Sequence, residues 1–225
     1  MTATVSSKRA QTQDRLMDAA TALFAEKGVL AASVEEICER AGFTRGAFYS
    51  NFESKDELML AVFKRQSDAI LKAATDAIAS VPPTRIEPRT VDEVIRQALQ
   101  IFQAAHSTDD QWLLACSEIR LHALRNPDVR VAINQIDDDL DALMAQAIQS
   151  VIDQHGLVLK IAPDQLISLL GAYQQELAFD ALREGKPSSA ADSAEPLATL
   201  VRALIEIPLS IEAAHRLATP AARRR

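Results

Sequence analysis

Residues 16–55 read LMDAATALFAEKGVLAASVEEICERAGFTRGAFYSNFESK. Apolar residues recur at helical spacing over residues 16–27 and again over residues 34–41, which predicts two amphipathic helices. Gly28 and Gly42 follow these stretches and predict where each helix ends. Ser33 and Glu36 have the spacing of a capping box, so the second helix is expected to begin just after Ser33. A third helix is expected over residues 44–52. Two helices joined by a short glycine-containing turn form the helix-turn-helix motif, whose second helix enters the major groove of DNA.

The third helix is short and polar, so it can bury one face and must expose the other. Phe48 and Phe52 lie four residues apart and are expected to pack against the first two helices. Arginine can bind guanine or phosphate, and tyrosine can donate a hydrogen bond to phosphate. The alternative is an ordinary three-helix fragment whose polar face has no function. The residues left facing outward are Arg45, Gly46, Tyr49 and Ser50.

Residues 16–63 resemble the N-terminal domain of TetR-family (AcrR-like) transcriptional regulators. The resemblance rests on F-x-E-K-G, S-V-x-x-I, A-G-F, F-Y-x-x-F and S-K-x-E-L, in this order along the segment. It implies that Thr44 caps the recognition helix and touches phosphate, and that Lys55 contacts phosphate. Ser50 stands where the family commonly has an aromatic residue, and Asn51 where it commonly has histidine; both departures concern the operator sequence rather than the binding mode. The predicted DNA-binding residues are Ser33, Thr44, Arg45, Gly46, Ala47, Tyr49, Ser50, Asn51 and Lys55.

Beyond this segment the apolar pattern is helical throughout, and no strand pattern is present. Helices are expected over about residues 54–81, 110–124, 128–155, 163–185 and 194–216, with a further one beginning near Thr90 and a bend or end near Pro208. The expected fold is all-α, with about nine helices. An N-terminal three-helix helix-turn-helix domain (residues 1–53) precedes a six-helix ligand-binding and dimerisation domain (residues 54–217) and a flexible basic tail (residues 218–225).

The resemblance also implies a homodimer formed through the last two helices and a small-molecule effector held among the middle helices. The effector is unidentified: an inward Arg120 would suit an anion, whereas Glu176 would suit a cation. The predicted ligand-binding residues are Phe63, Phe102, Trp112, Cys116, Ile119, Arg120, Tyr173 and Glu176, with His122 as a further candidate. The predicted dimer-interface residues are Leu166, Leu170, Tyr173, Leu177, Leu197, Leu200, Val201 and Leu204.

The formal net charge of −7 at first argues against a nucleic-acid partner. However, residues 1–65 contain as many basic as acidic residues, so the excess of acid lies wholly in the remainder. A neutral headpiece can still present a basic face to phosphates, while an acidic body resists non-specific binding. The sequence shows no secretory segment and no membrane span, which predicts a cytoplasmic protein without a membrane partner.

Signatures of other chemistry are missing from the sequence. The four histidines lack zinc-site spacing, and there is no G-x-S-x-G, P-loop or dinucleotide-binding glycine pattern. Four aspartates within residues 137–141 are expected to form a solvated helix face rather than a cation site. Cys38 and Cys116 are expected to be buried free thiols rather than a disulfide or redox switch. We therefore expect no enzyme activity, no cofactor and no metal.

Taken together, these features predict a DNA-binding transcriptional regulator, in the form of a ligand-responsive repressor that binds a palindromic operator as a dimer. The alternatives are a transcriptional activator and a ligand-binding or dimerisation module that does not bind an operator. Whether Arg45 and Tyr49 project from the surface discriminates between DNA binding and the last alternative.

Overall fold

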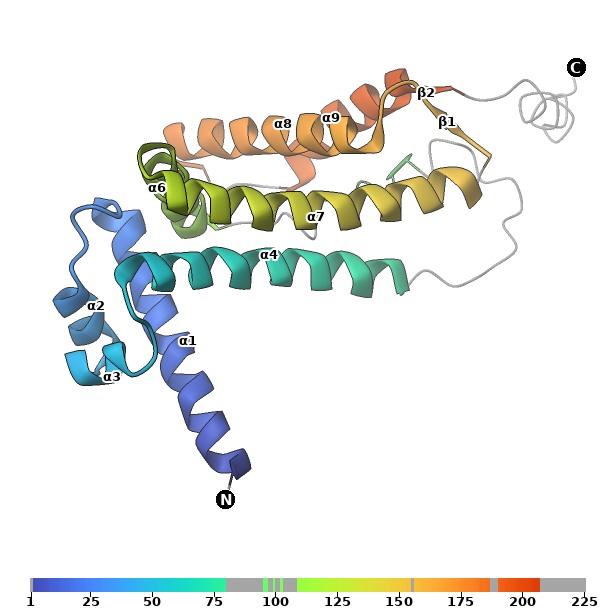
Figure 1. Cartoon of the computed structure of the whole chain (residues 1–225). Helices are drawn as coiled ribbons and strands as arrows, with labels where there is room; N and C mark the ends of the chain where they lie inside the picture. The colour runs from blue at the N-terminus through green and yellow to red at the C-terminus, as the bar shows by residue number, and fades with distance from the viewer. Residues whose placement is uncertain are drawn as a thin grey trace, which may run out of the picture. The chain divides into compact units, whose positions relative to one another are not determined.

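The computed structural model describes residues 2–79, 95, 96, 99, 102, 109–154, 156–186 and 190–206. Within these residues the backbone forms eight helices and one pair of two-residue strands, so the predicted all-α class is confirmed (Figure 1). None of the described helices combines the length and the apolar character that a membrane span requires. The elements are α1 (Thr2–Lys27), α2 (Val34–Ala41), α3 (Arg45–Tyr49), α4 (Lys55–Ala79), α6 (Asp110–Arg125), α7 (Pro127–Gln154), β1 (Val158–Leu159), α8 (Pro163–Arg183), α9 (Ala190–Leu204) and β2 (Ile205–Glu206).

The chain folds into two compact units, each assembled from three separate segments. The first unit contains Met1–Ile70, Thr108–Leu140 and Ala178–Ser188, and the second contains Leu71–Ser107, Asp141–Leu177 and Ser189–Arg225. Helices α4, α7 and α8 therefore each contribute residues to both units. The predicted boundary follows residue 53, whereas the first unit also takes in α6 and the beginnings of α4 and α7. The predicted tail lies outside the described residues.

The core of the first unit joins the N-terminal helices to α6. Helix α1 packs against both α2 and α6. Leu16 and Phe24 on the predicted stripe of α1 are fully buried, as are Phe48 of α3 and Ile119 of α6. Burying an apolar side chain of this size contributes roughly 1.5–3 kcal/mol. Helix α6 is therefore part of the core that supports the helix-turn-helix rather than an addition to it.

The second unit has a separate apolar core. It is formed by the C-terminal half of α7, by α8 and by α9, together with the strand pair. Ile95, Leu99 and Phe102 are also buried in this core, and they are the only residues between 91 and 107, apart from Arg96, that the structure describes. The remainder of the helix expected after Thr90 lies outside the described residues.

The strands and the end of the last helix differ from the prediction. Strands β1 and β2 pair antiparallel, with Val158 opposite Glu206 and Leu159 opposite Ile205. Two residues are too few to produce the alternation by which strands are recognised in a sequence. Helix α9 ends at Leu204 rather than near residue 216, because the chain becomes extended at Ile205 to pair with β1. Pro208, where a bend was expected, lies outside the described residues.

Candidate DNA-binding surface and ligand cavity

The turn between α2 and α3 has the geometry that the sequence predicts. The Glu36 N–H donates to Ser33 Oγ at 3.3 Å, and the Ser33 N–H donates to Glu36 Oε2 at 3.0 Å, so the capping box is formed. Gly42 follows α2 with φ +72°, a conformation that favours glycine. The Ala47 N–H donates to Thr44 Oγ1 at 3.2 Å, which makes Thr44 the N-cap of α3. These local contacts fix where α3 begins and how it leaves α2.

The carboxylate of Glu36 has a second role in this turn. The Lys27 ammonium at the end of α1, together with hydrogen bonds from Ser33, lowers the pKa of Glu36 from 4.5 to about 2. A carboxyl group whose pKa is lower in the folded state than in the unfolded state stabilises the fold only while it is ionised. The contribution of Glu36 is therefore complete above about pH 4.5 and is lost as the pH falls toward 2.

We expect replacement of Glu36 with glutamine to reduce the pH dependence of stability between pH 5 and pH 2.5. Urea unfolding followed by circular dichroism across this range measures the midpoint at each pH. Glu39→Gln, on the exposed side of the same helix, controls for the loss of one negative charge. A Glu36→Gln midpoint that falls with acid as steeply as that of the unmodified protein would contradict the role of this capping box.

Helix α3 buries one face and exposes a polar one. Phe48 is fully buried and Phe52 nearly so, with their ring centroids 6.0 Å apart. Tyr49 is 51% exposed, and Arg45 is also exposed. Arg45 Nη2 lies 3.5 Å from the Tyr49 hydroxyl, to which it donates, and Arg45 Nη1 lies 2.5 Å from Glu35 Oε1. The projection of Arg45 and Tyr49 from the surface is thus the arrangement that distinguishes a DNA-reading helix from a buried one.

Other predicted DNA-binding residues form contacts within the chain. Ser50 Oγ and Asn51 Nδ2 both donate to the Ala47 carbonyl, at 2.9 and 2.8 Å, and so close the end of α3. Lys55 Nζ donates to the carbonyls of Val29 and Ala32 at 2.6 and 2.8 Å, and burial lowers the pKa of this ammonium. Two of its three N–H groups therefore tie the start of α4 to the turn after α1. A phosphate contact by Lys55 stays a prediction, with one N–H group left to make it.

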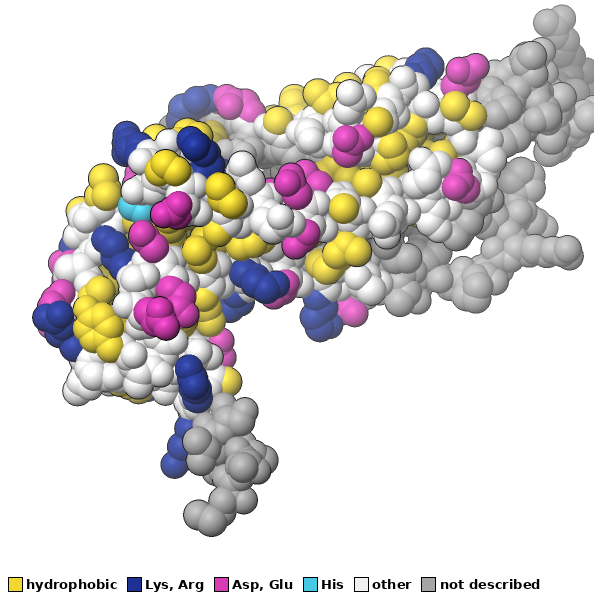
Figure 2. Space-filling model, in the orientation of Figure 1, with side chains coloured by type: hydrophobic (Ala, Val, Ile, Leu, Met, Phe, Trp, Pro, Cys, Tyr) yellow, Lys and Arg dark blue, Asp and Glu magenta, His cyan; other side chains and the backbone are white. Residues whose placement is uncertain are grey.

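Charge on the first unit is mixed rather than uniformly basic. Dark blue and magenta side chains alternate over α1, α2 and α3 in Figure 2. Arg40 forms a two-point pair with Glu26, and Arg65 pairs with Asp18 at 2.8 Å. Ion pairs of this kind leave few cations available for phosphate. DNA binding by this unit would accordingly depend on a small number of well-placed side chains.

The second unit contains an apolar cavity of about 100 Å³. Its lining comes from α4, α7, α8, α9, both strands and the residues described between 95 and 102. Every lining side chain ends in carbon or sulfur. The lining residues are Ala74, Ile95, Leu99, Phe102, Met144, Ala147, Ile148, Val151, Ile152, Leu157, Leu159, Leu166, Leu170, Val201 and Ile205.

Comparison with known proteins assigns this arrangement to a family. Residues 16–62 match the family described as bacterial regulatory proteins, tetR family. The chain is 24% identical over 183 residues to the HTH-type transcriptional regulator SrpR of Pseudomonas putida, covering 71% of this chain and 85% of SrpR. These matches support a TetR-family transcriptional regulator. This family consists of DNA-binding regulators and not of enzymes, in agreement with the sequence prediction.

Two solved structures show the same fold as this TetR-family regulator. The fatty acid degradation regulator FadR from Bacillus halodurans has a TM-score of 0.66 at 14% identity, covering 84% of this chain and 93% of FadR. FadR from Bacillus subtilis in complex with stearoyl-CoA has a TM-score of 0.62 at 17% identity, covering 83% of this chain and 95% of that chain.

The predicted ligand-binding residues of this TetR-family regulator are not brought together. Phe102 lines the cavity, and the other seven are not among its lining residues. Phe63 and Ile119 are buried in the first unit, with Trp112 and Cys116 packed against the same core. Tyr173 and Glu176 are exposed on α8. Two of the aromatic side chains chosen from the sequence, Phe63 and Trp112, lie at the core of the first unit instead of bordering the cavity, with their ring centroids 6.2 Å apart.

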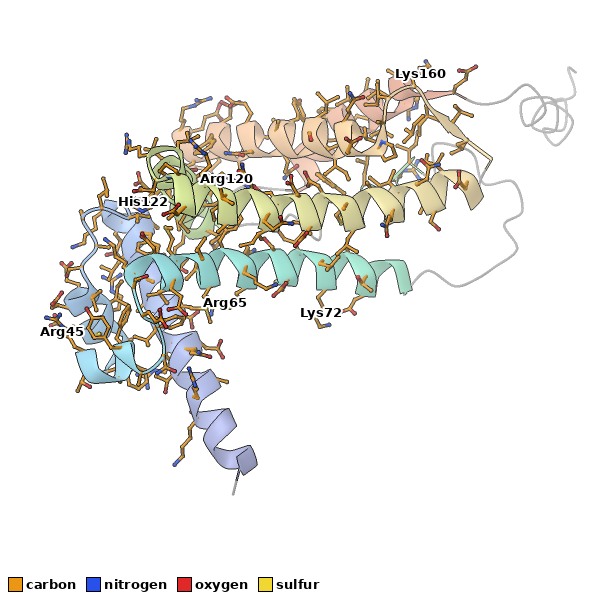
Figure 3. All side chains as sticks on the ribbon, in the orientation of Figure 1. Arg45, Arg65, Lys72, Arg120, His122 and Lys160 are labelled. Carbon is orange, nitrogen blue, oxygen red and sulfur yellow. The ribbon has the colours of Figure 1, made fainter. Side chains whose placement is uncertain are left out.

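Arg120 is committed to contacts within the first unit (Figure 3). It makes a two-point ion pair with Asp137, at 2.7 and 3.0 Å, and its guanidinium lies 5.1 Å from the centre of the Phe63 ring. The charge that would suit an anionic effector is therefore already balanced by a carboxylate. Among the described lining residues that sequence reasoning missed, α7 supplies more than any other element, and it presents Met144, Ala147 and Val151 to the cavity at helical spacing.

The predicted dimer-interface residues divide into two groups. Leu166, Leu170, Leu197 and Val201 are buried within the second unit, and all but Leu197 line the cavity. In this conformation their side chains pack within the chain, and their part in an interface stays a prediction. The residues that retain exposed surface are Tyr173, Leu177, Leu200 and Leu204.

Helix α6 also contacts the start of α4 through His122, which the sequence suggested as a further ligand-binding candidate, and the end of α1 through Glu118. His122 is 8% exposed, and its Nε2 lies 3.2 Å from Asp56 Oδ1 in the first turn of α4. Gly28 at the end of α1 has φ +85°, a conformation that favours glycine, and a Cβ there would lie 2.7 Å from Glu118 Oε2 at the end of a flexible side chain of α6. Figure 3 shows His122 on α6, close to the start of α4.

The remaining chemical groups are consistent with a binding protein. Cys38 and Cys116 are free thiols, and burial raises the pKa of both. Among the residues that the structure describes, no group of His, Cys, Asp and Glu side chains could hold a metal ion. In the acidic run on α7, Asp137 pairs with Arg120 and Asp139 accepts a hydrogen bond from Gln135 at 2.8 Å.

Proposed function

We propose that this protein is a cytoplasmic, ligand-responsive repressor that binds a palindromic operator as a homodimer. The observation that carries the proposal is the exposed Arg45–Tyr49 face of α3, supported from beneath by the buried ring of Phe48. This five-residue helix begins at a defined N-cap and follows a glycine-containing turn. The arrangement is that of a recognition helix poised to enter the major groove.

Gly46 supports the same conclusion. Its backbone is not in the left-handed region, and a Cβ at this position would find its nearest contact at 3.7 Å, on Thr44 Oγ1. The fold therefore has room for alanine, although glycine within a helix costs about 1 kcal/mol relative to alanine. Because Gly46 has no side chain, the backbone of another molecule can come close to α3 at this exposed position. A DNA strand beside α3 would make use of that space.

The dimer is proposed through α8. Leu169 is 48% exposed and Tyr173 38% exposed, and with Leu177 they follow each other at four-residue spacing. Figure 2 shows hydrophobic side chains gathered over α8 and along its border with α7. Binding to adjacent half-sites of a palindrome requires two recognition helices one helical turn of DNA apart, roughly 34–36 Å. Each protomer would then bind one half-site of the palindrome.

The effector is proposed to bind in the apolar cavity of the second unit. FadR from Bacillus subtilis, which has the same fold, was crystallised in complex with stearoyl-CoA, and this supports ligand binding by a protein of this fold. Helix α4 begins in the helix-turn-helix unit and reaches the cavity at Ala74. A ligand that binds more tightly to a conformation in which α4 is tilted differently would shift the protein toward that conformation, to the extent of its difference in affinity. The separation of the recognition helices would change with it. A change in the spacing of the two recognition helices disturbs their match to the half-sites more easily than it creates one. This favours a repressor that the ligand releases from the operator.

Replacement of Arg45 with methionine should weaken operator binding about 10- to 100-fold and relax the preference at one base pair, if Arg45 reads guanine. Glu35→Gln should instead strengthen binding by about two- to fivefold, because it frees Arg45 from an exposed ion pair. The operator is obtained by selection from random duplexes with the full-length protein, and affinity is measured by fluorescence anisotropy at several salt concentrations.

Arg40→Met is the matched control, since it removes the same charge from a side chain already paired with Glu26. It should change affinity less than Arg45→Met and leave base preference intact. If selection yields no palindrome and neither Arg45→Met nor Glu35→Gln changes affinity, α3 does not read DNA, and the module without operator binding is favoured. Reporter transcription that rises with operator occupancy would identify an activator.

A further inference from the structure

Among the residues that the structure describes, the cavity of the second unit has no polar side chain in its lining. The fifteen described residues that line it are aliphatic, aromatic or thioether. Strands β1 and β2 pair with each other, and the Lys160 N–H donates to the Leu204 carbonyl at 2.9 Å. Lys160 Nζ donates to the Ala203 carbonyl at 3.0 Å, and the residue lies at the strand pair in Figure 3. The strand pair contributes the apolar side chains of Leu159 and Ile205 to the cavity.

This lining determines what can occupy the cavity. A buried carboxylate or ammonium would lose its hydration without gaining a counter-charge or a hydrogen bond, at a large free-energy cost. Water is also a poor occupant, because a buried water typically needs two to four polar partners. An uncharged hydrocarbon surface has no such requirement and gains by leaving water.

The lining also has room to adapt. Met144 is flexible and polarizable, so it can follow the outline of different apolar ligands. Ala74 and Ala147 lie on α4 and α7, where small side chains leave space that larger ones would fill. The volume of the cavity therefore depends on a few small residues, and replacing one of them with a larger residue tests whether the cavity binds ligand.

We propose that this cavity binds uncharged, hydrocarbon-rich molecules and discriminates against carboxylates and ammonium ions of the same length. The proposal concerns the class of ligand and rests on the proposed function only for its regulatory consequence. The sequence left an anionic effector, suited to Arg120, and a cationic one, suited to Glu176, as open possibilities, and neither residue is among the lining residues.

The test uses the full-length protein without DNA and three probes of equal chain length: 1-octanol, octanoate and octylammonium. Isothermal titration calorimetry and thermal unfolding measure binding. We expect 1-octanol to bind with a negative heat-capacity change and to raise Tm. Octanoate and octylammonium should each bind at least about tenfold more weakly, because burial of their charge is not compensated.

Ala147→Phe fills the cavity and should reduce 1-octanol binding at least about tenfold through loss of space. Ala142→Phe, an exposed position on the same helix, is the matched control and should bind 1-octanol as the unmodified protein does. If Ala147→Phe fails to fold, Ala147→Leu is used and should weaken binding to a smaller extent.

Failure of 1-octanol to bind would overturn the proposal. So would octanoate or octylammonium binding as tightly as 1-octanol, or Ala147 variants that keep the affinity of the control. Since no DNA is present, these outcomes are separate from those of operator binding: a protein that binds 1-octanol but no operator would contradict the proposed function and leave the ligand class intact.

Discussion

Replacement of Phe48 with alanine is expected to abolish specific DNA binding while leaving the cavity unit folded. Phe48 is fully buried and is the main anchor of a five-residue helix, with its ring 5.2 Å from that of Tyr49 and 6.0 Å from that of Phe52. Removing a buried phenylalanine side chain costs about 3–5 kcal/mol, a large part of the stability of a typical domain. Helix α3 would no longer hold Arg45 and Tyr49 in place.

Affinity for the selected operator should then fall about 1000-fold or more, to the level of non-specific binding. Fluorescence anisotropy with specific and scrambled duplexes measures this loss, and circular dichroism measures the stability. Phe48→Leu keeps an apolar side chain at the site and should retain most of the affinity. Phe48→Ala with normal operator affinity would show that α3 is not the reading element.

Glutamate at both Leu169 and Tyr173 is expected to convert the protein into a monomer. Burial of each side chain at a subunit interface would contribute roughly 1.5–3 kcal/mol, and the substitutions would place like charges across the two-fold axis. Operator affinity should drop about 100-fold or more, because one recognition helix then binds one half-site without the gain from linkage to a second. Sedimentation equilibrium reports the mass, and anisotropy reports the affinity.

Leu124→Glu is the matched control for this pair, since Leu124 is 68% exposed on α6 and lies outside the proposed interface. It should leave both mass and affinity unchanged. Substitution of Leu170 would be a poor test, because this residue is buried within the protomer and its loss would disturb the core. A double variant that stays dimeric would place the interface elsewhere.

The DNA-binding face could be predicted from the sequence because its determinants are close together in the chain. Ser33 and Glu36 are three residues apart, and Phe48 and Phe52 four, so spacing alone defines the caps and the buried face. What spacing could not show is that Glu35, from the preceding helix, pairs with Arg45. Nor could it show that Lys55 reaches back to the carbonyls of Val29 and Ala32.

The cavity could not be predicted in the same way. Its lining is drawn from segments that extend from Ala74 to Ile205, and no periodicity within one helix records how these segments meet. Large residues such as Trp112 attract attention in a sequence, yet a cavity lies where side chains are small or flexible, as at Ala147 and Met144. The strand pair was missed because two residues carry no periodic signal.

The division of each unit among distant segments has a consequence for the order in which the protein matures. The first unit contains the recognition helix but also needs residues 108–140 and 178–188. A nascent chain that has emerged only as far as α4 has therefore made every residue that faces DNA, yet lacks Ile119 and the rest of α6 against which α1 packs. The reading helix gains its full support only after most of the sensing region has been synthesised. Under the proposed function, an incomplete chain that lacks the ligand cavity would also lack the full support of α3, and we expect it to bind the operator weakly.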